Sequence, residues 1–322
     1  MLAEVEPGEL TEDEMLAWAL PTAANQFWML SEPERATAFL QATRGKVSSP
    51  AARTTLDALS ATFAMNAGNL GRAVELADEV LGSSAADDTA VGWAGSAAAL
   101  CAARMGRFAD VDALAERAMS AGQPGLLRFT SGFGQTSALL MAGEPERALE
   151  LARHLTDFAQ RRQPGRAIGE VLVADVLIAT GQTAQAVALL RQSAATLAPT
   201  GYSWGPLAWM LLAQALGRLG ETVEAGKALS RAESRHGLKS MLFAPELALA
   251  RAWTMSARRD AHGAVAAARD AVKAAERGGQ QAVALRAAAD AVVLGDPRAG
   301  ETLTRIAQQV PCAFGRDAVA GL

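Results

Sequence analysis

The sequence predicts an all-α fold, a superhelical α-solenoid of about eight antiparallel helix pairs with a period of 37–39 residues. Three observations carry this prediction: a helix-forming composition, a glycine-centred turn that recurs along the chain, and two columns of small residues in register with that turn. Of 322 residues, 50% are hydrophobic but only 5% are aromatic, and Tyr202 is the single tyrosine. Such a composition favours helices over strands, which are enriched in aromatic and β-branched residues.

The recurring turn is clearest at 142–148, where the sequence AGEPERA separates two apolar helical runs. Glycine at its centre supplies the positive φ of a helix C-cap, and the Glu and Pro that follow suit the first turn of the next helix. The same turn recurs near eight positions: Ser31, Gly68, Gly106, Gly143, Gly181, Gly220, Arg259 and Gly295. Each turn predicts one helix pair.

Two columns of small residues keep the same register as these turns. Five residues after each turn stand Ala36, Ala73, Val111, Ala148, Ala186, Ala225, Ala264 and Gly300. Seven residues before it stand Ala24, Ala61, Ala99, Thr136, Ala174, Ala213, Ala252 and Ala288. Small side chains at both places let the helices of a pair approach closely. The columns are typical of tetratricopeptide (TPR) repeats, so we expect a TPR-like stack forming one domain over residues 1–322.

Charge and composition exclude several classes of function. The net charge of −4 and isoelectric point near 5.6 argue against a nucleic-acid-binding surface. The sequence contains no Lys/Arg cluster of the kind that binds anionic lipid. The acidic N-terminus lacks the pattern of a secretory signal. Cys101 and Cys312 lie far apart in the sequence, which fits free thiols in a reducing compartment. We therefore expect a cytoplasmic protein that binds neither nucleic acid nor membrane.

Catalytic and metal-binding motifs are missing from the sequence. The three histidines, His154, His236 and His262, have no partners at metal-ligand spacing, and two cysteines do not make a zinc site. There is no Gly-x-Ser-x-Gly elbow and no phosphate-binding loop. The sequence therefore predicts a protein that is not an enzyme and that holds no metal or cofactor.

The first helix of each pair is expected to line the concave side of the superhelix. Counted from the turn, positions −13, −10, −6 and −3 share one helix face. Position −6 holds Asp175, Gln214 and Trp253 on three successive inner helices, and Glu246 lies two turns before Trp253. Carboxylate and amide groups beside an indole suit a neutral polyhydroxyl ligand. We predict that these four residues bind such a ligand.

Four further residues join this predicted site. Phe133 stands at position −10, Gln135 at an expected core position, Arg251 on a later inner helix, and Trp204 at the start of a helix. A second interpretation of the same polar residues stays open, because the groove of a superhelix is wet and can simply solvate them.

The whole chain resembles the helical-repeat sensor region of the large ATP-dependent, LuxR-type (MalT-like) transcription regulators. The resemblance lies in the turns, AGEPERALELA at 142–152 being typical, and in a degenerate repeat of just under forty residues. It implies a sensor domain for a small inducer, with glucose-based sugars such as trehalose or a maltooligosaccharide as the expected class. It further implies that the ATPase and DNA-binding domains are absent from this chain, that the full protein self-associates, and a high-GC bacterial source.

Two other functions compete with the sensor. A TPR-type scaffold would hold a peptide in the groove, although the −6 column contains only one asparagine, Asn25, of the kind that binds a peptide backbone. A glycosidase-like enzyme would use the paired carboxylates of Asp175 and Glu246. The polar residues concentrate in the fourth to seventh pairs, which favours a compact pocket over a long peptide groove.

Overall fold

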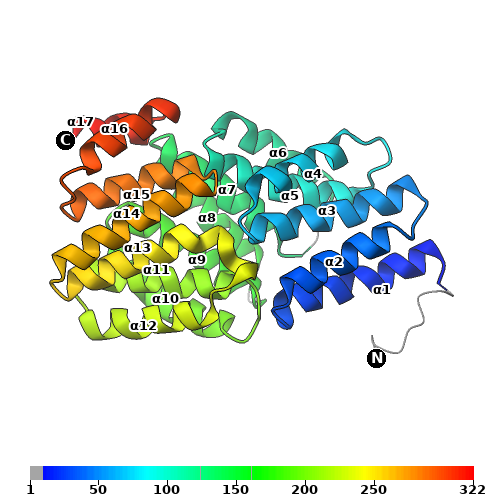
Figure 1. Ribbon diagram of the computed structural model, residues 1–322, viewed down its shortest axis with the longest axis horizontal. Helices are drawn as coiled ribbons and strands as arrows, with labels where there is room; N and C mark the ends of the chain where they lie inside the picture. Colours follow the sequence, from blue (N-terminus) through cyan, green and yellow to red (C-terminus); the bar gives the residue numbers. More distant parts are fainter. Residues whose placement is uncertain (1–9, 124, 161) are drawn as a thin grey trace.

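The computed structural model describes residues 10–123, 125–160 and 162–322, and these residues form helices without any strand. The helices follow one another as α1 (Glu12–Ala24), its π-helical continuation η3 (Asn25–Met29), α2 (Pro33–Arg44), α3 (Pro50–Asn66), α4 (Leu70–Gly82), α5 (Asp88–Met105), α6 (Phe108–Ser120), α7 (Leu127–Met141), α8 (Pro145–Phe158), α9 (Gly165–Ala179), α10 (Thr183–Leu197), α11 (Trp204–Arg218), α12 (Thr222–Arg235), the 3-10 segment η4 (Leu238–Phe243), α13 (Ala244–Ala257), α14 (Ala261–Arg277), α15 (Gln281–Val293), α16 (Ala299–Gln309) and α17 (Ala313–Ala320). Successive helices stack as antiparallel hairpins (Figure 1).

Every one of the eight expected turns lies between the two helices of a pair and has a left-handed backbone. The six glycines have φ between 77° and 88°. Ser31 (φ 57°) and Arg259 (φ 61°) adopt the same conformation without being glycine, at a cost of roughly 1–2 kcal/mol each. The backbone therefore confirms the TPR-like solenoid and its register.

The two columns of small residues form the tight contacts inside the pairs. From the second pair to the seventh, the side chains of both columns are at most 1% exposed. Neighbouring pairs also approach closely at Gly217, where an added Cβ would lie 2.6 Å from the backbone carbonyl of Trp253. A backbone separation this small accommodates glycine at position 217 and no larger residue without a shift of the helices.

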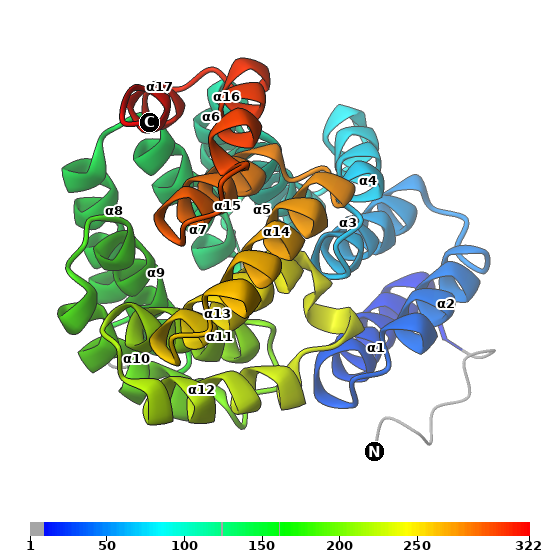
Figure 2. The same cartoon turned by 60° about the vertical axis from the view of Figure 1, so that its left-hand side comes forward.

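The superhelix curls far enough for its later pairs to pack against earlier ones. Helix α15 contacts α5, and α17 contacts α7, as Figure 2 shows from the side on which these helices meet. At this junction Val310 lies against Gly106, where an added Cβ would come within 2.9 Å of the Val310 side chain. The concave side is consequently enclosed between the last helices of the stack and the third and fourth pairs.

The short segment η4 interrupts the hairpin pattern between α12 and α13. It packs against α3 and α13, so it crosses from the later repeats to the second pair. The first pair forms a hydrophobic core with α3 in which Phe27 stacks on Phe63, with ring centroids 4.1 Å apart. Segment η4 thus lies across the concave side, between the first pairs and the later ones.

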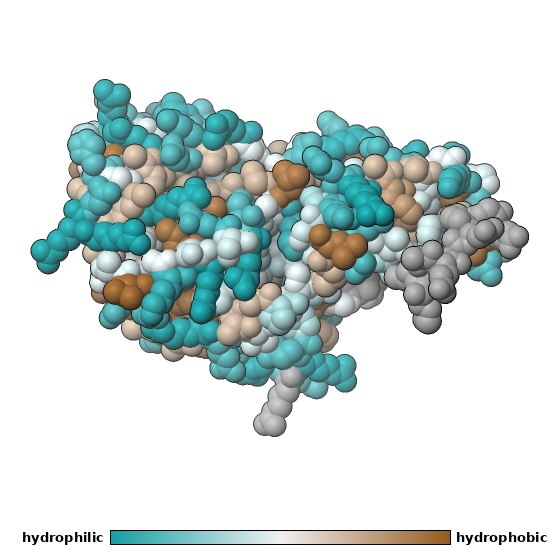
Figure 3. Space-filling view, turned by 60° about the horizontal axis from the view of Figure 1, so that its bottom comes forward, coloured by the Kyte–Doolittle hydropathy of each residue, from teal (hydrophilic) through white to brown (hydrophobic). Residues whose placement is uncertain are grey.

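The outer surface is mostly polar on the face that Figure 3 shows, with small separate hydrophobic areas. Of the helices in the described ranges, none is both long and apolar enough to span a lipid bilayer.

Candidate ligand-binding cavities

Two cavities lie on the inner face of the stack, and both are lined by the first helices of the pairs. The larger, which we call the aromatic chamber, has a volume of about 540 Å³ and is lined by Pro21, Ala24, Asn25, Trp28, Met29, Thr62, Met65, Asn66, Trp93, Leu100, Gly125, Leu126, Leu127, Thr130, Tyr202, Ser203, Trp204, Leu242 and Phe243. The smaller, the ionic cavity, has a volume of about 190 Å³ and is lined by Ala103, Arg104, Phe133, Ser137, Met141, Asp175, Ile178, Ala179, Leu207, Leu211, Gln214, Arg218, Glu246, Leu249, Ala282, Val283, Arg286, Ala289, Asp290, Val293 and Phe314.

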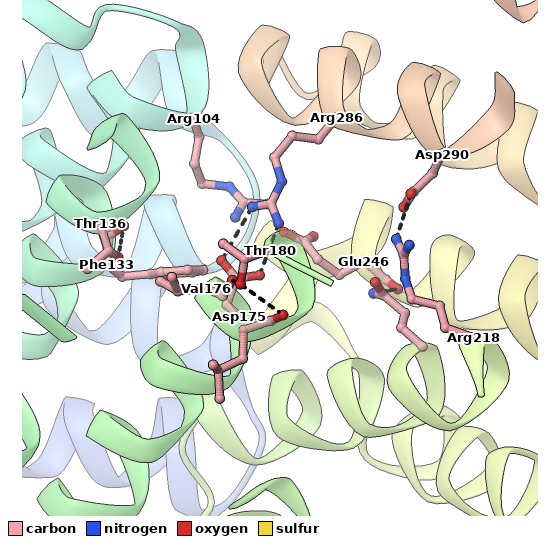
Figure 4. Close-up of polar contacts among 12 residues, drawn as sticks. Arg104, Phe133, Thr136, Asp175, Val176, Thr180, Arg218, Glu246, Arg286 and Asp290 are labelled. Atoms are coloured by element: carbon pink, nitrogen blue, oxygen red, sulfur yellow. Dashed lines mark hydrogen bonds and ion pairs between the residues drawn. The ribbon is translucent and has the colours of Figure 1, made fainter. Parts of the chain in front are cut away.

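Ion pairs across the superhelix dominate the ionic cavity (Figure 4). Arg286 on α15 donates from Nη2 to Asp175 Oδ1 at 3.1 Å and from Nη1 to Oδ2 at 3.3 Å. Because the Asp175 carboxylate faces this guanidinium, the pKa of Arg286 is raised. A second pair joins Arg218 Nη2 to Asp290 Oδ1 at 2.6 Å. These bonds tie α9 and α11 to α15.

Arg104 makes a third ion pair and holds η4 at the same time. Its Nη2 donates to Glu246 Oε1 at 2.7 Å and to the Leu242 carbonyl at 2.9 Å. Its Nε donates to Gln280 Oε1 at 2.6 Å, and Gln280 Nε2 donates to the same Leu242 carbonyl at 3.1 Å. Arg104 is only 4% exposed and its guanidinium lies 5.4 Å from the centroid of the Phe243 ring. This one side chain therefore links α5, α13 and the segment that walls the aromatic chamber.

The aromatic chamber has a different chemistry. Among the described residues that line it, none carries a charged side chain, whereas five carry aromatic rings: Trp28, Trp93, Tyr202, Trp204 and Phe243. The rings of Trp28 and Tyr202 meet edge to face with centroids 6.1 Å apart. Two amides, Asn25 and Asn66, supply its strongest hydrogen-bonding groups; Asn66 Nδ2 donates to the Thr62 carbonyl at 2.9 Å. Such a lining suits an apolar ligand that also presents amide groups.

Segment η4 fastens the chamber on the side of the first pair. Lys239 Nζ donates to the carbonyls of Trp28 and Gly201, at 2.7 Å each. Ser203 Oγ donates in turn to the Lys239 carbonyl at 2.6 Å. Burial lowers the pKa of Lys239. The wall of the chamber is therefore held by hydrogen bonds from residues far apart in the sequence.

The structure brings four of the predicted site residues into the ionic cavity: Phe133, Asp175, Gln214 and Glu246. Gln214 Nε2 donates to the Glu246 carbonyl at 3.0 Å, so its amide is partly engaged. Trp204 lines the aromatic chamber instead, where its ring lies 5.7 Å from that of Phe133. Phe133 and Trp204 thus stand on either side of the partition between the cavities.

The other three predicted residues line neither cavity. Trp253 is 8% exposed, and the guanidinium of Arg218 covers its ring at 4.0 Å from the centroid, so the expected open stacking face is occupied. Gln135 turns toward α6 and donates to Asp112 at 3.0 Å. Arg251 pairs with Glu233 on the surface at 2.7 Å. These three residues therefore lie outside the walls of both cavities, and their part in ligand binding stays a prediction.

The sequence analysis missed a register position that lines both cavities. Position −2 holds Asn66 in the chamber and Arg104 and Arg218 in the ionic cavity. Position −2 is polar in three of the eight pairs and otherwise holds Met29, Met141, Ala179, Ala257 and Val293, so the column gave only a weak signal. The arginine of the remaining pair, Arg286, stands at −9, which shares a helix face with −13 and −6, but no other charged residue stands in that column.

The described residues contain no cluster of three His, Cys, Asp or Glu side chains arranged to hold a metal ion. Burial raises the pKa of the Cys101 thiol to about 12, so this sulfur is not an activated nucleophile.

Comparison with known proteins identifies the fold. No protein-family model matches the sequence, and no curated protein matches it. The structure of a Rap protein complexed with competence and sporulation factor is similar, with a TM-score of 0.67 and 13% identity over 99% of this chain and 88% of that one. A tetratricopeptide repeat protein from Parabacteroides merdae has a TM-score of 0.45 with 9% identity, covering 80% of this chain and 92% of that one. The apo form of RapI has a TM-score of 0.43 with 11% identity, covering 93% of this chain and 86% of that one. At 13% identity, the Rap likeness shows a shared TPR-like architecture.

Proposed function

We propose that this chain is a binding protein that takes a peptide in the aromatic chamber and acts by binding rather than by catalysis. The observation that carries the proposal is the lining of the chamber, about 540 Å³ of space bounded by aromatic rings and amides and free of charged side chains among the described residues. Apolar peptide side chains would pack on the rings, while amides pair with peptide backbone groups. The Rap protein of similar fold was solved with a bound factor, which supports a binding role for this architecture.

Two features of the chain agree with this function. The chamber is lined by helices from the first, second, third, fourth and sixth pairs, so a single ligand would contact residues far apart in the sequence. The π-helical segment η3 contributes Asn25, Trp28 and Met29 to the lining, and π-helical turns are frequent at functional sites. The peptide would therefore join the first pair to the rest of the stack.

The test is an affinity selection from a random hexapeptide pool, followed by titration of the selected peptides against the intrinsic tryptophan fluorescence. We expect Trp93→Leu to weaken binding about tenfold or more, because aromatic anchors dominate peptide and protein interfaces. Asn66→Ala should weaken it roughly 3- to 10-fold through the loss of an amide partner. Ser60→Ala on the same helix as Asn66, outside the lining, is the matched control. Failure to enrich any peptide would reject the proposal.

A second candidate is the sugar-sensing domain of a MalT-like transcription regulator, with residues 1–322 as one sensor domain. The convergence of Asp175, Gln214 and Glu246 on one cavity favours it. Against it, ion pairs with arginines already engage both carboxylates, so sugar hydroxyls would have to compete with charges. Trehalose, maltose or maltotriose at about 100 times the dissociation constant would stabilise the fold by roughly 2.7 kcal/mol. A rise in melting temperature that Asp175→Asn abolishes would support this function over peptide binding.

A further inference from the structure

The ionic cavity differs from the aromatic chamber in size as well as in chemistry. At about 190 Å³ it is smaller than the 300–1,000 Å³ of pockets for drug-sized ligands, and matches a molecule the size of a single amino acid. Phe133, on its wall, contacts Trp204 and Phe243 of the chamber, with ring centroids 5.7 and 6.5 Å apart. The partition formed by these rings makes the ionic cavity a separate site.

The charges on the walls of the ionic cavity balance. Arg104, Arg218 and Arg286 face Glu246, Asp290 and Asp175 in three ion pairs. A ligand with a net charge would bring one uncompensated charge among these partly buried pairs, which is unfavourable. The cavity therefore favours a ligand whose own charges sum to zero.

Two polar atoms on these walls are buried and have no hydrogen-bond partner: Glu246 Oε2 and Arg218 Nε. One is an anionic acceptor and the other a cationic donor, and they belong to different ion pairs. Leaving such groups unpaired is costly, so a ligand that satisfies both gains affinity. An ammonium group pairs with Glu246 Oε2, and a carboxylate pairs with Arg218 Nε. Sugar hydroxyls would offer neither charge.

Apart from Ser137 and Gln214, the rest of the lining is apolar. Leu207 and Leu211 on α11 stand beside Ile178 and Leu249 from the neighbouring inner helices. These four side chains form a wall suited to an aliphatic group, whereas a polar side chain would be buried there without partners.

We propose that the ionic cavity binds a small zwitterion, an α-amino acid with an apolar side chain. The ammonium group lies at Glu246, the carboxylate at Arg218, and the side chain against the leucines of α11. This proposal is independent of peptide binding, because the two cavities share no lining residue.

The test is isothermal titration of the intact chain with L-leucine, L-methionine and L-phenylalanine, beside two analogues of leucine. Leucinamide lacks the carboxylate and 4-methylpentanoate lacks the ammonium group. We expect binding of at least one of the three amino acids and an at least tenfold weaker affinity for both analogues of leucine. Glu246→Gln should weaken the amino acid at least tenfold, whereas Glu224→Gln, in an exposed pair with Lys227, should not.

A second variant keeps the test decisive if Glu246→Gln unfolds. Leu211→Phe fills the cavity from its apolar wall and should abolish binding while the peptide affinity of the aromatic chamber is unchanged. The proposal is overturned if none of the three amino acids gives a titration signal at concentrations up to about 10 mM. Equal affinity for leucine and leucinamide overturns it as well, as does binding of trehalose or maltose that Leu211→Phe abolishes.

Discussion

Arg286 and Asp175 lie 111 residues apart in the sequence and form a two-pronged ion pair with N–O distances of 3.1 and 3.3 Å. The carboxylate is on the fifth pair and the guanidinium on the eighth, so the bond spans the concave side of the stack. Asp175 is 4% exposed to solvent, whereas the side chain of Arg286 is 32% exposed. The pair therefore helps to hold the enclosed form of the superhelix.

Asp175→Asn tests how much this pair stabilises the fold. Loss of the carboxylate leaves the Arg286 cation without its partner, but partial exposure allows water to solvate it. We expect the free energy of unfolding to fall by roughly 1–3 kcal/mol, measured by urea denaturation. The exposed pair of Glu144 and Arg147 is the control, and Glu144→Gln should cost about 0–1 kcal/mol. Equal effects of the two substitutions would contradict a stabilising role for the Arg286–Asp175 pair.

Gly217→Ala tests the close approach of α11 and α13. The added methyl group would lie 2.6 Å from the carbonyl of Trp253, so the two helices must separate. We expect a loss of about 1–3 kcal/mol in the free energy of unfolding. Gly71→Ala provides the opposite case, because no atom lies within 4 Å of its added methyl. That variant should gain about 0.5 kcal/mol from the reduced entropy of the unfolded chain. A neutral Gly217→Ala would mean that α11 and α13 are not packed this tightly.

The sequence was sufficient to predict the repeat because the repeat is local. A turn conformation depends mainly on the residue that adopts it. Glycine at 106 and at 143 is therefore enough to predict the positive φ that both residues have. Helical spacing likewise placed Asp175, Gln214 and Glu246 on one face, and they line one cavity. These inferences need only the 3.6-residue helical period and the repeat length.

The partners of those residues were not predictable in the same way. Arg104 and Glu246 are 142 residues apart, and they meet because small rotations between successive pairs add up to a closed superhelix. No pattern in the sequence predicts the total rotation between these distant pairs. Trp253 lies against Arg218 of the adjacent inner helix α11 rather than facing an open groove, because the two helices pack closely. Segment η4, an insertion without a counterpart in the other repeats within the described chain, also falls outside any periodic argument.

His236 makes the stability of the chain depend on pH. Its pKa is lowered, first by burial and then by the nearby Arg251 cation, so the folded state favours the neutral ring. Between the lowered pKa and about 6.5 the unfolded chain binds more protons than the folded one. The contribution of the neutral ring to stability is therefore present above about pH 6.5 and is lost as the pH falls through the folded-state pKa.

His236→Asn should reduce the loss of stability between pH 7 and pH 5. The measurement is the urea midpoint at a series of pH values, with His262→Asn, an exposed position, as the control. His236 Nδ1 and Ser240 Oγ share a hydrogen bond of 3.0 Å at the start of η4. An unchanged pH profile in His236→Asn would assign the pH dependence to other groups.

Lys239→Met tests whether η4 fastens the first pair. The methionine keeps most of the aliphatic stem but removes the two hydrogen bonds from Nζ to the carbonyls of Trp28 and Gly201. Hydrogen bonds from a charged donor contribute about 1.5–3 kcal/mol each. We expect amide hydrogen exchange over residues 12–29 to accelerate roughly tenfold or more, because opening of this pair then breaks fewer interactions. Lys227→Met, which removes an exposed lysine of α12, should leave exchange unchanged.

The same variant connects the fastening of the first pair to ligand binding. Trp28 and Met29 line the aromatic chamber from the first pair, and Leu242 and Phe243 line it from η4. If Lys239 holds these two walls together, Lys239→Met must weaken peptide binding in proportion to the population of the opened state, since a ligand that needs both walls binds only the closed form. Faster amide exchange with unchanged peptide affinity would mean that the peptide contacts only one wall. Unchanged amide exchange would mean that the core around Phe27 and Phe63 holds the first pair without Lys239.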